Sequence, residues 1–292
     1  MKKDLVIAIT GSHGFVGSAL VARFRAQGHT VIPLPREIGL LPGCDVLIHL
    51  AGESPAGYWT ARKRRAIYTS RVLGTRRLVA RLRDAVSLPK VFLCASAVGV
   101  YGHRPGEPLD EASAPGRGFR ADTCLDWEAE ARKAEALGVR TLRLRFGTIL
   151  DPSGGYLGRM LPLLKHGLCF VLGDPEDRFA WISLEDAVRM IEFAMTHETV
   201  SGALNVVAPV PATQGAFARA AAALAGRRVL GQLRAGFLRA SLGELAAAIV
   251  DVQDVAPAKA LQEGFGHVHP TLQFWSSSLD RPEMDPVLEK AS

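Results

Sequence analysis

The stretch LVIAITGSHGFVG, residues 5–17, decides the fold of this chain. Residues 5–9 form an apolar run rich in β-branched side chains, which predicts a strand buried on both of its faces. Residues 18–27 have helical spacing, so a turn must join a buried strand to a helix. Three glycines occupy that turn and the start of the helix: Gly11, Gly14 and Gly17.

This arrangement of glycines predicts a dinucleotide site. A helix that starts directly after a buried strand directs free N–H groups and the positive end of its dipole at a pyrophosphate. We assign Gly11 to the tight turn, Gly14 to the close approach of the pyrophosphate, and Gly17 to the contact between helix and sheet.

Predicted strands and helices alternate along the rest of the first half of the chain. Strand-like runs cover residues 30–34, 44–50, 90–94 and 139–146, and helical patterns cover 60–85 and 128–137. Such alternation predicts an α/β fold, a Rossmann-type doubly wound parallel sheet with a smaller C-terminal substrate lobe.

The regular alternation of strand-like and helical stretches ends after residue 150, where we place the domain boundary. We expect residues 1–150, completed by about 180–208, to form the NAD(P)-binding Rossmann lobe, and residues 151–179 and 209–292 to form the smaller substrate lobe. The tail from Ser276 has little apolar periodicity, and we expect it to be loosely attached.

The composition is that of a globular protein, with 48% hydrophobic and 22% charged residues in a chain of 292. The hydrophobic fraction argues against intrinsic disorder, and no stretch approaches the roughly 20 apolar residues of a membrane helix. The N-terminal apolar run is too short for a signal peptide. The four cysteines are scattered without disulfide-framework or metal-ligand spacing, so we expect a cytoplasmic protein. Apart from His267 and His269, which stand beside Pro270 in an expected loop, the histidines have no metal-ligand spacing, and we expect no metal site.

The end of the second strand bears on the choice of cofactor. An acidic residue there would hold a ribose 2′-hydroxyl and favour NAD, whereas the chain has Arg36, whose guanidinium can pair with a 2′-phosphate. Glu37 follows directly and leaves NAD as the alternative. We predict NADP as the cofactor, with NAD less favoured.

The net charge of +6 raises the question of a nucleic-acid partner. Much of the excess lies in the helical stretch 60–85, which no nucleic-acid-binding motif accompanies. We therefore predict no nucleic-acid partner and interpret the basic residues as a solvated helix face. Arg71 is the exception, since it could reach the cofactor phosphates from the inner face of that helix.

Several motifs resemble those of one family. TGSHGFVG (10–17), HLAGE (49–53) and ASAVGVYG (95–102) resemble the extended short-chain dehydrogenase/reductase superfamily. C-x-x-WEAEA (124–131), GGYLGRMLP (154–162), AWISLEDA (180–187) and EGFGHVHPTL (263–272) are similar to its NAD(P)-dependent epimerase/dehydratase-like subgroup, the epimerase family proteins. The resemblance covers residues 1–275 and implies NADP binding, an unidentified small-molecule substrate and a homodimer.

The resemblance also implies a set of cofactor-binding residues beyond the glycines. It places the backbone of residues 50–52 beside the adenosine and that of 146–149 along the nicotinamide. The cofactor-binding residues expected in this way are Phe15, Val16, Leu50, Ala51, Gly52, Arg71, Ser96, Phe146 and Ile149.

The chain departs from the superfamily at the catalytic positions. The usual Tyr-x-x-x-Lys pair, whose lysine lowers the pKa of the tyrosine, is replaced by Cys124 and Glu128. The usual Ser/Thr position, four residues before Tyr101, holds alanine, with Ser96 next to it. The candidate acid/base residues are therefore Cys124, Ser96, Tyr101 and Glu128, with Asp110 and Glu111 as further carboxylates.

Three interpretations of these departures stay open. The chain is an oxidoreductase or nucleotide-sugar-epimerase-like enzyme with relocated acid/base groups, an NADP-binding sensor with little activity, or a structural partner that kept the fold. For each candidate residue a purely structural role is the alternative, and for Cys124 a packed core thiol is the favoured interpretation.

Overall fold

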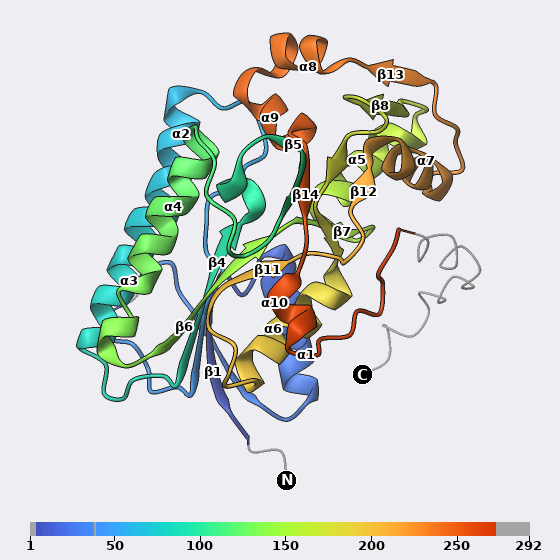
Figure 1. Cartoon of the computed structure of the whole chain (residues 1–292). Coiled ribbons are helices and arrows are strands. Elements are labelled where there is room, and N and C mark those ends of the chain that lie inside the picture. Colours follow the sequence, from blue (N-terminus) through green and yellow to red (C-terminus); the bar gives the residue numbers. More distant parts are fainter. Residues whose placement is uncertain (1–3, 38, 273–292) are drawn as a thin grey trace.

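A six-stranded parallel sheet forms the centre of the molecule in the computed structural model, which describes residues 4–37 and 39–272 (Figure 1). Its strand order is β11-β6-β4-β3-β1-β2. The bounds are β1 Val6–Thr10, β2 Thr30–Leu34, β3 Val46–His49, β4 Val91–Ala97, β6 Arg140–Phe146 and β11 Gly202–Val206. β1 has β2 on one side and β3 on the other, so the winding direction reverses between β1 and β3. The predicted doubly wound sheet is confirmed, and ligands of such sheets bind where the order reverses.

Helices cover both faces of the sheet (Figure 1). Ile7 and Ile9 of β1 pack with α1 (Phe15–Ala26) and α6 (Leu184–Thr196). Ala8 points to the other face, where α3 (Gly74–Arg83) and α4 (Phe119–Arg132) pack. Every residue of the strand except Val6 is therefore fully buried, as its uninterrupted apolar run predicts.

Two predicted helices differ from the observed ones. The helix expected over 128–137 is α4, which begins nine residues earlier at Phe119, while residues 135–137 form a short 3-10 turn. The start was missed because α4 buries polar side chains, among them Thr123 and Glu128, so its apolar periodicity is weak. The helix expected over 60–85 consists of α2 (Ala61–Tyr68), a π-helical segment (Thr69–Leu73) and α3.

A second group of elements packs beside the carboxyl ends of the sheet strands. Its helices are α5 (Gly155–Lys165), α7 (Gln214–Leu224), α8 (Ala235–Leu242) and α9 (Ala247–Val250). Its short strands form the pairs β8 (Phe170–Leu172) with β13 (Gly231–Leu233), and β9 (Arg178–Phe179) with β12 (Ala212–Thr213). Leu157, Trp181 and Phe217 share a core cluster there, separate from those of the sheet.

The chain then returns to the sheet, so the second lobe is not one continuous segment. β14 (Gln253–Val255) pairs with β5 (Arg104–Leu109), and α10 (Ala258–Gln262) lies against β11. β7 (Thr148–Asp151) and β10 (Trp181–Ser183) form a further pair near the lobe junction. The predicted lobe boundaries stay a prediction, and the tail predicted from Ser276 lies outside the described residues.

The last described segment is held by one buried carboxylate. Asp186 at the start of α6 accepts hydrogen bonds from the backbone N–H groups of Val268 and His269, both at 2.8 Å. Ser183 Oγ and Arg189 complete its shell, so the charge of Asp186 is fully compensated. Within residues 4–37 and 39–272, no helix has the length and apolar character needed to cross a membrane.

Candidate functional site

The glycine turn between β1 and α1 has the geometry of a phosphate cradle. Gly11 has φ +70°, and a Cβ there would lie 2.8 Å from the backbone N of Ala51. A Cβ on Gly17 would lie 2.1 Å from the carbonyl oxygen of Gly11, so α1 packs this closely only with glycine. α1 starts after Gly14 without a side-chain cap, which leaves its first N–H groups for a ligand.

The ring of Phe15 packs against the start of α5, and its predicted contact with the cofactor stays a prediction. Its ring lies against Gly154 and Gly155, where an added Cβ would come within 2.7 Å and 2.6 Å of ring carbons. The double glycine of the GGYLGRMLP motif thus makes room for the aromatic ring. This contact joins the glycine turn to the start of α5, and an open hollow of about 530 Å³ lies beside it.

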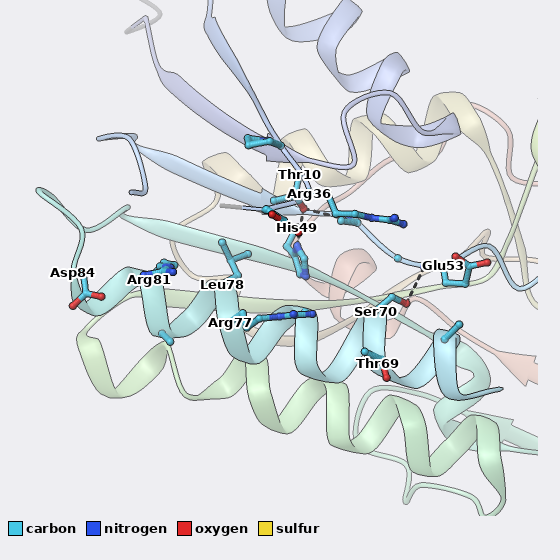
Figure 2. Close-up of a pocket in the computed structure, with 17 residues that line it drawn as sticks. Thr10, Arg36, His49, Glu53, Thr69, Ser70, Arg77, Leu78, Arg81 and Asp84 are labelled. Atoms are coloured by element: carbon cyan, nitrogen blue, oxygen red, sulfur yellow. Dashed lines mark hydrogen bonds between the residues drawn. The ribbon is translucent and has the colours of Figure 1, made fainter. Parts of the chain in front are cut away.

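A larger cavity of about 690 Å³ lies at the switch point of the sheet (Figure 2). Thr10, Arg36 and His49 line it at the ends of β1, β2 and β3, and α3 forms its floor. Of the predicted cofactor residues, Ala51 and Gly52 also line it. The cavity therefore occupies the place where a doubly wound sheet binds the adenosine half of a dinucleotide.

Three guanidinium groups face this cavity: Arg36, Arg77 and Arg81. Figure 2 shows Arg36 and His49 above the helix that carries the other two arginines. In the part of the chain that the structure describes, none of the three side chains has a hydrogen bond or an ion pair. Glu53 at one end of the cavity is paired with Lys63 at 2.6 Å, which lowers the pKa of Glu53. The arrangement suits a ligand with a negative charge.

Most basic residues of the helix face are exposed where the sequence predicts a solvated face, and two of them also line the cavity. Arg77 and Arg81 stand four residues apart on α3 and face the cavity together. Arg76, the residue before Arg77, points away from the cavity and pairs with Glu130 at 2.8 Å. The i,i+4 spacing was visible in the sequence, although nothing there indicated which face of the helix meets the sheet.

Arg71 lies beside the cavity without lining it. Its Nη1 donates to the backbone oxygen of Glu53 at 2.9 Å, and its guanidinium lies over the ring of Trp127. Burial lowers the pKa of Arg71, while the nearby thiol of Cys124 and Glu53 act in the opposite direction. Its predicted contact with cofactor phosphates stays a prediction.

His49 shapes the cavity from within the core. Its two ring nitrogens lie 2.6 Å from Thr10 Oγ1 and 3.1 Å from Thr75 Oγ1, so both are satisfied. Burial lowers the pKa of His49 from 6.5 to about 4. The ring is therefore neutral at physiological pH and bridges β1, β3 and α3 as a structural group.

Of the two residues at the usual catalytic positions, Glu128 is part of a buried hydrogen-bond network. Its two oxygens accept from Arg145 Nε at 2.8 Å and Arg145 Nη2 at 2.9 Å, a bidentate pair. Ser96 Oγ donates to the same carboxylate at 2.7 Å. Ser96 and Glu128 thus meet in the structure, but each is bound to protein groups.

Tyr101 extends this network on the far side of Arg145. Arg145 Nη1 donates to the Tyr101 hydroxyl at 2.8 Å, and that hydroxyl donates to Asn205 Oδ1 at 2.7 Å. Burial raises the pKa of Tyr101, and the nearby Arg145 opposes that rise. Glu111 accepts from the backbone N–H of Asn205, so this carboxylate also holds structure together.

Cys124 lies on α4 one turn before Glu128 and is buried. Burial raises the pKa of its thiol to about 11, with Arg120 opposing the rise and Glu128 adding to it. Desolvation is the largest cause of this rise, and the Glu128 carboxylate acts in the same direction. The thiol is protonated at neutral pH, and a deprotonation step would cost free energy.

A small cavity of about 130 Å³ lies between the carboxyl ends of β4 and β6 and the second lobe. Phe146, predicted along the nicotinamide, lines it, as do Ala97 and Arg120. None of the four acid/base candidates is among the residues that line this cavity or the larger one. The remaining predicted cofactor residues, Val16, Leu50 and Ile149, pack against the core of the sheet.

Comparison with known proteins places the chain in a family. A profile of the NAD dependent epimerase/dehydratase family matches residues 7–207. The chain belongs to this family. The epimerase family protein MT2273 of Mycobacterium tuberculosis is 34% identical over 289 residues, which cover 92% of this chain and 95% of that protein. The resemblance inferred from the motifs is therefore confirmed.

Solved structures of this and related families share the fold. The crystal structure of the human epimerase family protein SDR39U1 with NADPH superposes with a TM-score of 0.85 at 29% identity, covering 91% of this chain and 96% of that one. A UDP-glucose 4-epimerase of Thermus thermophilus in complex with NAD has a TM-score of 0.72, covering 92% and 96%. At 18% identity it shows the shared fold alone.

Proposed function

We propose that this epimerase family protein is an NADP-dependent oxidoreductase, or an epimerase-like enzyme, acting on a small molecule. The observation that carries the cofactor assignment is the cavity at the switch point, beside a glycine turn. Three guanidiniums face it, and none of them is paired within the described residues. The structure of human SDR39U1 with NADPH supports the choice, and the relatives crystallised with NAD keep NAD as the alternative.

The residues present fit NADP. The glycine turn leaves no room for a Cβ at Gly11 or Gly17, and the first N–H groups of α1 would hold the pyrophosphate. Arg36, Arg77 and Arg81 would hold the 2′-phosphate, a group with about two negative charges and three acceptor oxygens. When bound, the nicotinamide supplies hydride transfer.

The acid/base candidates are better suited to donating a proton than to accepting one. Among the four candidates, Ser96, Tyr101 and Glu128 are engaged with protein partners, while the Cys124 thiol is protonated at neutral pH. We propose the Cys124 thiol on α4 as the group that holds a proton for a substrate. The thiol does not line either cavity, but it interacts with the backbone of Ala97 at the end of β4, and Ala97 lines the small cavity. Glu128 and Ser96 would position α4 against the sheet.

An NADP-binding sensor with little activity is the second candidate function. One observation favours it: Glu128 stands where a catalytic lysine is expected, and its carboxylate is paired with Arg145 at 2.8 Å and lies 3.7 Å from Arg143. Titration of the native protein with a panel of carbonyl compounds and nucleotide sugars, followed by NADPH absorbance, separates the two functions. Turnover that Cys124→Ala abolishes supports the enzyme, and no turnover with intact NADPH binding supports the sensor.

Calorimetric titration with NADPH and NADH tests the cofactor assignment. We expect NADPH to bind at least tenfold more tightly, and Arg36→Gln to weaken NADPH binding tenfold or more with little change for NADH. Arg83→Gln is the matched control, because this arginine also lies on α3 but outside the cavity. Tighter binding of NADH, or an unchanged preference in Arg36→Gln, would reject NADP as the cofactor.

We also propose that the protein works in the cytoplasm. The four cysteines are free and buried, which is compatible with a reducing compartment. Fractionation of the native host would check this, and recovery of the protein in an oxidising compartment would contradict it.

A further inference from the structure

Arg120 on α4 is anchored by only one edge of its guanidinium. Its Nη1 donates to Asp251 Oδ2 at 2.9 Å and to the backbone oxygen of Ala247 at 2.7 Å. Both partners belong to the segment around α9, so this arginine links the sheet lobe to the second lobe. The anchor fixes the orientation of the planar guanidinium.

The other edge of the same guanidinium, Nε and Nη2, has no hydrogen-bond partner among the residues of 4–37 and 39–272. This edge lies over Gly99 of the ASAVGVYG motif. A Cβ on Gly99 would sit 3.4 Å from both nitrogens, so the glycine leaves the open edge accessible. Two parallel N–H groups in a fixed fork match the two oxygens of a carboxylate.

The open edge belongs to the small cavity between the lobes. The cavity has a volume of about 130 Å³, close to that of a cavity known to hold a single benzene molecule, about 150 Å³. Three aromatic residues, Tyr156, Phe179 and Phe217, line one side of it. Tyr156 stacks on Phe217 with ring centroids 5.8 Å apart. A single ring with a polar group fits this space, whereas pockets for larger ligands span roughly 300–1,000 Å³.

The position of the cavity relates it to the cofactor site. Ala97, at the end of β4, and Phe146, at the end of β6, form its floor. These ends lie on the same edge of the sheet as the glycine turn, where doubly wound sheets bind ligands. A ligand in the cavity would therefore lie beside the cofactor rather than on a remote surface.

We propose that this cavity binds a small carboxylate, of about the size of one six-membered ring, through Nε and Nη2 of Arg120. That this carboxylate is the substrate rests on the proposed function. Arg120 supplies the charge and the bidentate geometry, Asp251 holds it in place, and the three aromatic side chains enclose the body of the ligand. A whole nucleotide sugar exceeds the enclosed volume.

Titration of the NADP-saturated protein with benzoate, benzamide and UDP-glucose tests the proposal. Benzoate and benzamide have the same ring and differ in the charge and hydrogen bonding of one group. We expect benzoate to bind at least tenfold more tightly than benzamide, and UDP-glucose not to compete with it. Equal binding of benzoate and benzamide, or displacement of benzoate by UDP-glucose, would overturn the proposal.

Two variants locate the site. Arg120→Gln and Gly99→Ala should each weaken benzoate binding tenfold or more, the second by covering the open edge while the anchor at Asp251 remains. Arg117→Gln, an exposed arginine at the turn before α4, is the matched control and should leave binding unchanged. Benzoate binding that survives Gly99→Ala would overturn the assignment, even if Arg120→Gln failed to fold.

The same titrations separate this inference from the proposed function. NADP binding is measured first, without benzoate. NADP binding without charge-dependent benzoate binding rejects the carboxylate site alone. Benzoate binding that depends on Arg120 in a protein that binds no NADP rejects the proposed function and leaves the site in place.

Discussion

Two regions at the carboxyl edge of the sheet differ in whether their charged side chains are paired with other protein groups. In the cavity at the switch point, Arg36, Arg77 and Arg81 face open space, and none of their side chains has a hydrogen bond or an ion pair within residues 4–37 and 39–272. At the usual catalytic positions, Glu128 is buried and bound by Arg145 and Ser96. Charges left open identify the region where a ligand is expected, and charges that are fully paired identify a structural one.

The difference has an energetic basis. A buried ion pair that loses one partner leaves an uncompensated charge in a medium of low dielectric constant. An exposed arginine that is removed from an open cavity leaves only solvent. We therefore expect substitutions in the Glu128 network to lower stability, and substitutions of the cavity arginines to lower ligand affinity.

The largest expected effect is on stability. Arg145→Met should lower the free energy of unfolding by about 3–5 kcal/mol, because Glu128 then stays buried without its bidentate partner. Urea denaturation measures this. The double variant Glu128→Leu/Arg145→Met should recover most of the loss, and exposed Arg83→Met should change stability by less than about 0.5 kcal/mol. A loss below about 1 kcal/mol in Arg145→Met would remove the contrast between the regions.

The second largest effect is the loss of stability at acidic pH caused by the buried His49. Burial lowers the pKa of His49 to about 4 from an ordinary 6.5, so the unfolded chain binds this proton more readily than the native protein. The contribution is fully present above pH 6.5 and is lost as the pH falls towards 4, a change of about 3 kcal/mol. Unfolding measured from pH 7 to 4 should show a smaller pH dependence in His49→Gln than in the wild type or in His13→Gln, which alters an exposed histidine. Equal pH dependence in all three would contradict this.

A smaller effect should appear at the arginines of α3. Arg77→Gln should weaken NADPH binding about tenfold, or about 1.4 kcal/mol, with a smaller change for NADH and no loss of stability. Arg81→Gln should behave in the same direction. Calorimetric titration checks both variants. A variant that loses stability but keeps its NADPH affinity would show that the substituted arginine stabilises the fold and does not bind the cofactor.

The sequence was sufficient for the fold and for part of the site. The glycine turn, the strand β1 and the position of Arg36 could all be predicted, because each follows from local spacing. The pairing of Glu128 with Arg145 could not be predicted, since Glu128 lies on α4 and Arg145 lies 17 residues later on β6, within a run that alternates arginine with apolar residues. Arg120 and Gly99 were also missed, because Arg120 is 21 residues from Gly99 and its anchor at Asp251 depends on how the two lobes meet.

The state of the 2′-phosphate of bound NADP tests the central claim most directly. A free phosphate monoester loses its second proton with a pKa near 6. If Arg36, Arg77 and Arg81 surround the phosphate, phosphorus NMR of the complex should show it as the dianion down to about pH 5, and Arg36→Gln should reverse part of this change. A bound 2′-phosphate that titrates near pH 6, as in free solution, would contradict the account.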